Sequence, residues 1–467
     1  MLFRDISLTA MALDAGPQKN RPYLSVVYTV GFNAIARQAR ERDSSLFLTT
    51  KTKEQKDSLL LQKQSYRNVS MRTVIRCAFW LLSLFLVSNI QAVTPQKGQL
   101  KLGAERMDVV TRLLKDKQVG LVVNQTSILE KQQKHLLDAL LEEGVSVKKV
   151  FAPEHGFRGT ADAGAEIKDS RDVKTGVPII SLYGKNKKPT AEQLTGLDVI
   201  VFDIQDVGAR FYTYISTMHY VMEACAENGV EFIVLDRPNP NDFVDGPVRE
   251  EKLKSFVGVD PLPILHGLTI GELAWMINKE GWLDSTPDTC KLHIVKMENW
   301  SHGDPYWLPV KPSPNLPNDQ AIRLYPSLCF FEGTNISVGR GTYYPFQMLG
   351  APDPKYGDFT FTPTSLPGFD TKPLHMDKEC YGIDLREYPF PGGLTLKFFL
   401  DFYNLAGKDQ AFFFSRPQWF DLLAGTKELR FQIIRGLSED EIRASWQPAL
   451  NEYKKLRNKY LLYPDYH

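Results

Sequence analysis

The segment VKKVFAPEHGFRG, residues 147–159, brings together side chains that can do acid–base chemistry. Glu154, His155 and Arg158 follow an apolar run that ends at a proline, and a glycine then permits a sharp turn. A carboxylate held over a cleft can have its pKa raised by desolvation, so that it serves as a general acid near neutral pH. The structural alternative is a loop glutamate that caps a backbone amide.

The segment DIQDVGARFYTY, residues 203–214, carries a second set of polar side chains. Carboxylate, amide, guanidinium and phenol groups together are typical of a sugar site, since planar polar groups bind hydroxyls and aromatic rings pack on pyranose faces. An Asp206–Arg210 pair that stabilises the start of a helix is the structural alternative. The set comprises Asp203, Gln205, Asp206, Arg210 and Tyr212.

A third candidate segment is FFEGTNISVGRGT, residues 330–342, which places Glu332, Asn335 and Arg340 between glycines. A loop of this composition can lie against a ligand cleft, or it can form a tightly packed junction between domains. Both interpretations stay open from the sequence.

The sequence gives little support for a metal site or a nucleotide-binding site. A metal site would have to use Glu154, His155, Asp203, Asp206 and His266, yet no His-x-x-His or His-x-His spacing is present. The first apolar run is followed by NQTSIL rather than a glycine-rich turn, and SVGRGT lacks the Lys-Ser/Thr pair of a phosphate-binding loop. The sequence therefore predicts no metal and no nucleotide cofactor.

Short apolar runs that alternate with amphipathic helical patterns must position these residues. Apolar strands separated by helices predict a parallel α/β sheet with helices on both faces. The carboxyl ends of such strands meet at one rim, so the polar residues that follow them, Asn239 included, are expected there. The predicted strands are 119–124, 147–153, 177–184, 198–206 and 231–238.

Beyond the sheet, an amphipathic helix is expected within 266–282, with Thr269 as its cap. A proline-rich stretch, 304–319, then predicts a linker or crossover. The first domain is thus expected to span 93–320, and a smaller α+β domain to span 321–467.

The amino-terminal part predicts export. Residues 71–92 have a basic start, an apolar core and a small-residue cleavage site, as in a secretory signal peptide, and a core of about 11 residues is too short to cross a membrane. Residues 1–70 are interpreted as a disordered, non-native upstream extension. The mature protein is expected to be periplasmic, without a stable membrane anchor. Buried free thiols are expected at Cys225, Cys290, Cys329 and Cys380.

The composition is that of an ordinary globular protein with a large core. Of 467 residues, 43% are hydrophobic and 24% charged, and the net charge is +1. No basic field favours nucleic acid as a partner, so small molecules or neutral polymers are expected instead.

The ordered motifs PEHGFRG, SLYG, DIQDVGARFYTYISTM, DRPNP, HGLTIGELA, PSPNLP and FEGTNISVGRGT resemble one family, the exo-acting peptidoglycan β-N-acetylmuramidases of the NamZ type. They extend from about residue 117 to 352. The resemblance implies a Rossmann-like amino-terminal domain, a smaller carboxyl-terminal domain and a cleft between them. It also implies release of N-acetylmuramic acid from the non-reducing ends of muramyl glycans, without a cofactor.

On this hypothesis Glu154 protonates the glycosidic oxygen, and the second carboxylate is Asp203, Asp206 or Glu332. The sugar's lactyl carboxylate would pair with an arginine, and its hydroxyl and N-acetyl groups would contact other polar residues. Arginine candidates are Arg158, Arg210 and Arg340; further binding candidates are His155, Gln205, Tyr212, Asn239 and Asn335.

Two other classes of function stay open at this point. One is a metal-dependent amidase or esterase that acts on cell-wall material and loses activity in chelator. The other is an exported protein that binds muramyl glycans without cleaving them.

Overall fold

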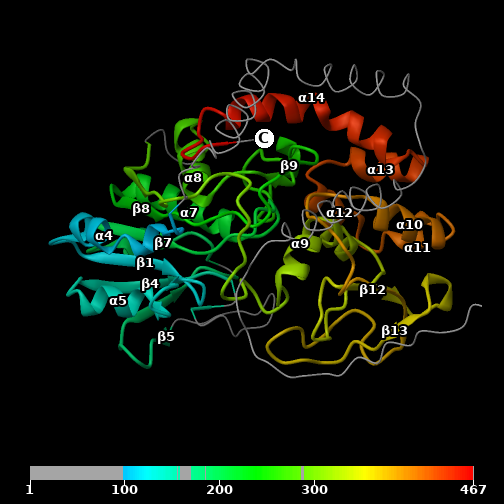
Figure 1. Ribbon diagram of the computed structural model, residues 1–467, viewed down its shortest axis with the longest axis horizontal. Helices are drawn as coiled ribbons and strands as arrows, with labels where there is room; N and C mark the ends of the chain where they lie inside the picture. The colour runs from blue at the N-terminus through cyan, green and yellow to red at the C-terminus, as the bar shows by residue number, and fades with distance from the viewer. Residues whose placement is uncertain (1–97, 155, 158–169, 185, 285–288, 466–467) are drawn as a thin grey trace, which may run out of the picture. The chain divides into compact units, whose positions relative to one another are not determined.

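The computed structural model describes residues 98–154, 156–157, 170–184, 186–284 and 289–465 (Figure 1). The predictions for residues 1–70 and for the signal peptide at 71–92 lie outside the described residues, as do those for His155 and Arg158. Within the described ranges, no helix combines the length and the apolar character needed to cross a membrane.

A seven-stranded sheet forms the first part of the chain, in the order β11-β8-β7-β1-β4-β6-β5. Six strands are parallel and only β5 is antiparallel. Their order is that of a doubly wound fold, with the change of direction between β1 and β7. The strands are β1 (Val119–Val123), β4 (Val147–Ala152), β5 (Ser170–Arg171), β6 (Pro178–Ser181), β7 (Val199–Asp203), β8 (Glu231–Leu235) and β11 (Leu292–Val295).

Helices cover both faces of this sheet, because alternate strand residues point to opposite sides. Val122 and Phe202 pack into the hydrophobic cluster that includes α7, whereas Leu121 and Val201 pack into the cluster that includes α4 and α5. The Rossmann-like α/β prediction is therefore confirmed. One face carries α6 (Ala191–Leu194), α7 (Tyr214–Asn228) and α8 (Ile270–Lys279); the other carries α4 (Met107–Leu114) and α5 (Leu136–Glu142).

Two local predictions are also confirmed. Thr269 caps α8: its hydroxyl accepts from the Glu272 amide, and the Glu272 carboxylate accepts from the Thr269 amide. The predicted buried free thiols are present at Cys225, Cys290, Cys329 and Cys380.

The second part is smaller and mainly helical, with a three-stranded antiparallel sheet in the order β12-β14-β13. Its core is rich in phenylalanine, and this core joins the one around α7 in a single cluster. The boundary at residues 320 and 321 stays a prediction. The elements are α9 (Asp319–Leu328), η4 (Cys329–Gly333), β12 (Met348–Ala351), η5 (Pro354–Tyr356), β13 (Phe359–Phe361), β14 (Cys380–Asp384), α10 (Lys397–Leu405), α11 (Gln410–Phe413), α12 (Pro417–Ala424), α13 (Glu428–Arg435) and α14 (Glu439–Arg457).

Several short elements connect these layers. They are η2 (Gly103–Glu105), β2 (Ile128–Leu129), β3 (Lys134–His135), β9 (Val244–Asp245), η3 (Glu251–Leu253) and β10 (Leu265–His266).

The end of the chain returns to the first part through a buried polar network. His302 lies between the carboxylates of Asp242 and Glu272, at 3.0 Å from each. Burial alone would lower the pKa of His302, but the two carboxylates outweigh it and raise that pKa to about 10. The Glu272 carboxylate also accepts from the amide of Leu462, which fixes the segment after α14.

Candidate active site

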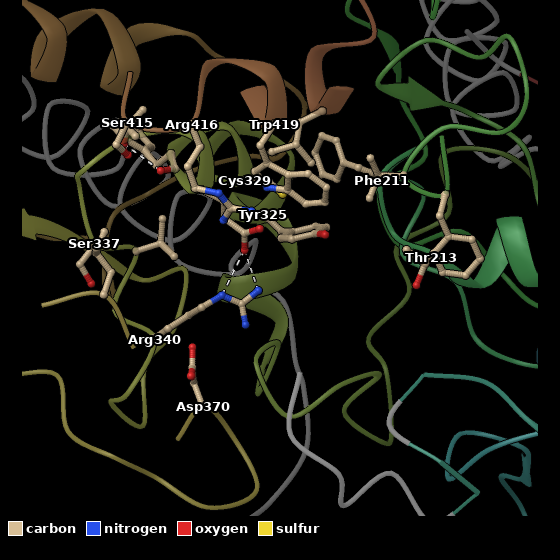
Figure 2. A pocket seen from close by; sticks show the side chains of 18 of the residues that line it. Phe211, Thr213, Tyr325, Cys329, Ser337, Arg340, Asp370, Ser415, Arg416 and Trp419 are labelled. Atoms are coloured by element: carbon tan, nitrogen blue, oxygen red, sulfur yellow. Dashed lines mark hydrogen bonds and ion pairs between the residues drawn. The ribbon is translucent and has the colours of Figure 1, made fainter. Parts of the chain in front are cut away.

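A cavity of 820 Å³ is formed jointly by the two parts of the chain. The first part contributes the segments that follow β4 and β6, the approach to α7 and residues 255–257. The second part contributes α9, η4, the glycine-flanked loop after it and α12. Figure 2 shows Thr213 on one side of the cavity and Arg340, Arg416 and Trp419 on the other. The volume is in the upper part of the roughly 300–1,000 Å³ range of small-molecule sites.

Glu154 is placed in this cavity by the turn that ends β4. Its Oε2 accepts a hydrogen bond of 2.8 Å from the Thr213 hydroxyl, and Tyr183 donates a second. Burial and the adjacent carboxylate raise the pKa of Tyr183, so the phenol keeps its proton and remains a donor. Because β4 and β6 are paired neighbours, the residues that follow them meet at one edge, as predicted.

The second carboxylate in the cavity wall is Glu332, at the end of η4. Its Oε1 accepts from Nε and Nη2 of Arg340, at 3.1 and 2.6 Å. Burial alone would lower the pKa of Arg340, but the Glu332 carboxylate outweighs it and raises that pKa. The Arg340 Nη1 is buried and has no hydrogen-bond partner among the described residues.

A narrower cavity of 80 Å³ adjoins the first and shares Glu154 and Arg340 with it. Tyr212 and Asn315 also line it. The predicted residues Glu154, Tyr212, Glu332 and Arg340 therefore do come together, since each lines one or both of these adjoining cavities.

Asp203 and Asp206 line neither cavity. Asp203 is fully buried, and both its oxygens accept from Arg237, at 2.6 and 3.0 Å. Asp206 is buried too, where it accepts from the amide of Gly208 and lies 3.6 Å from His266. In this structure the two carboxylates stabilise the end of β7 and the loop that follows it.

Arg210 is also placed away from the cavity. It is fully buried and donates to the carbonyls of Pro247, Leu262 and Leu423. The alternative Asp206–Arg210 pair is not formed, since Arg210 takes carbonyl oxygens as partners. Burial, together with Arg249, lowers the pKa of Arg210 to about 9.

The remaining binding candidates also lie outside the cavity lining. Gln205 donates to the carbonyls of Asp206 and Pro238, and Asn239 donates to the carbonyl of Leu268. Asn335 lies between lining residues Thr334 and Ile336 without lining the cavity itself. The environment of His155 and Arg158 lies outside the described residues.

Sequence reasoning missed several residues of the wall. Tyr183 lies at the end of the predicted strand 177–184, so it was expected at the rim, but it was not selected as a site residue. Thr213 precedes a helix and Asp370 lies in a long loop, where the sequence carries no comparable signal. The residues that were missed altogether are Lys187, Thr213, Phe256, Asp370, Lys372, Arg416 and Trp419.

A metal site would need several ligating side chains close together in the described part of the chain. Across that part of the chain, no three His, Cys, Asp or Glu residues are grouped closely enough to hold an ion. His266, which the metal hypothesis would use, has Nδ1 accepting from the Leu268 amide.

A cavity lined by carboxylates from both parts of the chain, Glu154 and Glu332 among them, together with a doubly wound sheet, defines a class of candidate glycoside hydrolases. Family models for the amino-terminal and carboxyl-terminal domains of exo-β-N-acetylmuramidase NamZ match residues 119–320 and 323–463. The chain is 42% identical over 395 residues to peptidoglycan β-N-acetylmuramidase NamZ of Bacillus subtilis, covering 79% of this chain and 93% of that protein. The chain therefore belongs to the exo-β-N-acetylmuramidase NamZ family.

Solved structures agree with this assignment. A DUF1343 family protein of Bacteroides fragilis is 43% identical and superimposes with a TM-score of 0.72. A second DUF1343 family protein of that organism is 32% identical, with a TM-score of 0.68. Each match covers 79% of this chain and all of the solved chain.

Thr213 should act as a positioning residue for Glu154. Replacing it with valine removes the 2.8 Å hydrogen bond to the carboxylate, so kcat on a muramic acid glycoside should fall roughly 10-fold while KM changes little. Thr213→Ser keeps the hydroxyl and should restore most of the activity. Equal kcat values for the valine and serine variants would contradict this role.

Proposed function

We propose that this chain is an exo-acting glycoside hydrolase that releases N-acetylmuramic acid from the non-reducing ends of peptidoglycan fragments. The observation that carries the proposal is that Glu154 and Glu332 line the same cavity, together with Arg340, which forms an ion pair with Glu332. Most glycoside hydrolases use two carboxyl groups that flank the scissile bond. Family membership supplies the substrate class.

In the proposed mechanism Glu154 is the general acid that protonates the leaving glycosidic oxygen. Thr213 and Tyr183 hold its carboxyl group in position. We assign Glu332 as the second carboxylate, because of the three candidates that the sequence offered it lines the cavity, whereas Asp203 and Asp206 have buried partners outside it. Arg340 holds this carboxylate at the cavity wall, where it can face the positive charge that develops on the sugar.

Arg340 is the candidate for the lactyl carboxylate that distinguishes muramic acid from glucosamine. Two of its nitrogens bind Glu332, while Nη1 has no partner among the described residues. An arginine–carboxylate contact sheltered from water is directional and strong.

Glu154→Gln should reduce hydrolysis roughly 100-fold or more, because the amide keeps the shape of the side chain but cannot deliver a proton. Ligand binding should persist, since the hydrogen-bonding atoms remain. Turnover of a chromogenic muramic acid glycoside and calorimetric binding of the sugar test both statements. Glu143→Gln, at an exposed position after α5, is the matched control. Normal turnover of a folded Glu154→Gln variant would exclude Glu154 as the acid.

Arg340→Lys should narrow the preference for muramic acid over N-acetylglucosamine glycosides roughly 10-fold, mainly through a higher KM for the former. Lysine keeps the charge beside Glu332 but cannot make the forked contact. Arg386→Lys alters another arginine–carboxylate pair, with Asp384, away from the cavity and should leave the preference unchanged. An unaltered preference in Arg340→Lys would refute the assignment.

We further propose that the protein is exported to the periplasm and takes part in recycling the cell wall. The support is the signal-peptide pattern at residues 71–92. Amino-terminal sequencing of periplasmic protein should give a start at or near Val93. Recovery of residues 1–70 on that protein would contradict both the export signal and the start site.

A further inference from the structure

Three basic side chains line the larger cavity and have no carboxylate partner in the described part of the chain. Lys187 follows β6, Lys372 lies in the loop before β14, and Arg416 precedes α12. Lys372 and Arg416 form hydrogen bonds only through backbone atoms in the described part of the chain. The Lys372 N–H donates to the Asp370 carboxylate, and the Arg416 N–H donates to the Gly333 carbonyl while the Arg416 carbonyl accepts from the Phe420 N–H. Their charged groups thus remain available to a ligand.

Aromatic rings hold two of these cations in place. The Lys187 ammonium lies 4.2 Å from the ring centre of Phe256, whose ring also stacks on Tyr220 at an interplanar angle of 6°. The Arg416 guanidinium lies 5.2 Å from the ring centre of Trp419. A cation over a ring face is attracted by it, so each charge is positioned before a ligand arrives.

The basic residues that line the larger cavity outnumber its carboxylates, which favours binding of an anion. Four basic residues line the cavity, against three carboxylates, Glu154, Glu332 and Asp370. Arg340 is already paired with Glu332. The unpaired positive charges therefore belong to Lys187, Lys372 and Arg416, and Lys187 and Arg416 come from opposite parts of the chain.

We infer that Lys187 and Arg416 form a subsite for a carboxylate on the leaving portion of the substrate. This inference rests on the proposed function, which places the released sugar beside Glu154 and Arg340, the charged residues that the two cavities share. Peptidoglycan alternates glucosamine and muramic acid, so the first sugar beyond the scissile bond is neutral and the second carries a carboxylate. The enzyme should therefore prefer fragments whose leaving portion includes a second muramic acid.

The test compares kcat/KM for four synthetic substrates. One is the disaccharide of muramic acid and glucosamine; the others extend it by a second muramic acid. That residue carries a free lactyl carboxylate, a lactyl carboxamide, or an L-alanyl group that moves the carboxylate outward as in a peptide stem. Substrates are measured with wild type, Lys187→Gln, Arg416→Gln, the double variant, and Lys427→Gln, which alters an exposed lysine outside the cavity.

Wild type should favour the acid trisaccharide over its carboxamide roughly 10-fold, with each cation contributing roughly two- to five-fold, as for partly exposed ion pairs. The double variant should bring that ratio near one, Lys427→Gln should leave it unchanged, and added salt should reduce it. A greater preference for the L-alanyl substrate than for the lactyl acid would assign the subsite to stem carboxylates.

Equal wild-type rates on the acid and carboxamide trisaccharides would overturn the inference and leave the proposed function standing, provided that the disaccharide is cleaved. Failure of wild type to cleave any of the four substrates would remove the proposed function itself, and the inference with it. Because the readout is a ratio within each variant, a general loss of activity does not imitate the expected result.

Discussion

The cavity depends on one buried guanidinium. Arg210 donates to the carbonyls of Pro247 and Leu262 in the first part and to that of Leu423 in α12. Burying an arginine without a carboxylate partner is costly, and three charge-assisted hydrogen bonds offset that cost. The one to Leu423 is made only while α12 stays in place. Since α12 carries Trp419 and follows Arg416, this contact sets the position of one wall relative to the wall that carries Glu154.

Most of the first part could be predicted from the sequence, because buried parallel strands are nearly continuous apolar runs. Two strands, β5 and β11, were not predicted, and the physical reason is the same for both. The β5 residues are exposed and polar. In β11, Leu292 and Ile294 are partly buried and His293 between them is exposed, so neither strand is a continuous apolar run. The second part was predictable only in outline, because long loops such as the one between β13 and β14 carry no periodic signal.

Residues of the candidate site could be predicted where their position relative to a strand places them at the rim of the sheet. Glu154 follows β4 directly, and the glycines around Arg340 allow its loop to lie against the cavity. What the sequence cannot specify is the direction of a side chain at the rim. Asp203, Arg210 and Tyr212 come from one short segment, yet only Tyr212 lines a cavity. Arg210 faces backbone carbonyls because the turn at Gly208 and the packing of residues 247–262 leave them nearby.

Two arginine–carboxylate ion pairs show what distinguishes a contact that supports the fold from one that can bind a ligand. In the Asp203–Arg237 pair both carboxylate oxygens are used and the side chains are 0% and 2% exposed, so nothing remains for a ligand. The Glu332–Arg340 pair uses one carboxylate oxygen, and its side chains are 20% and 24% exposed. The Arg340 Nη1 is buried and has no partner among the described residues. Since an unpaired buried polar group gains free energy when a ligand satisfies it, the Glu332–Arg340 pair is, under the proposed function, a better candidate for binding an anionic sugar than the Asp203–Arg237 pair.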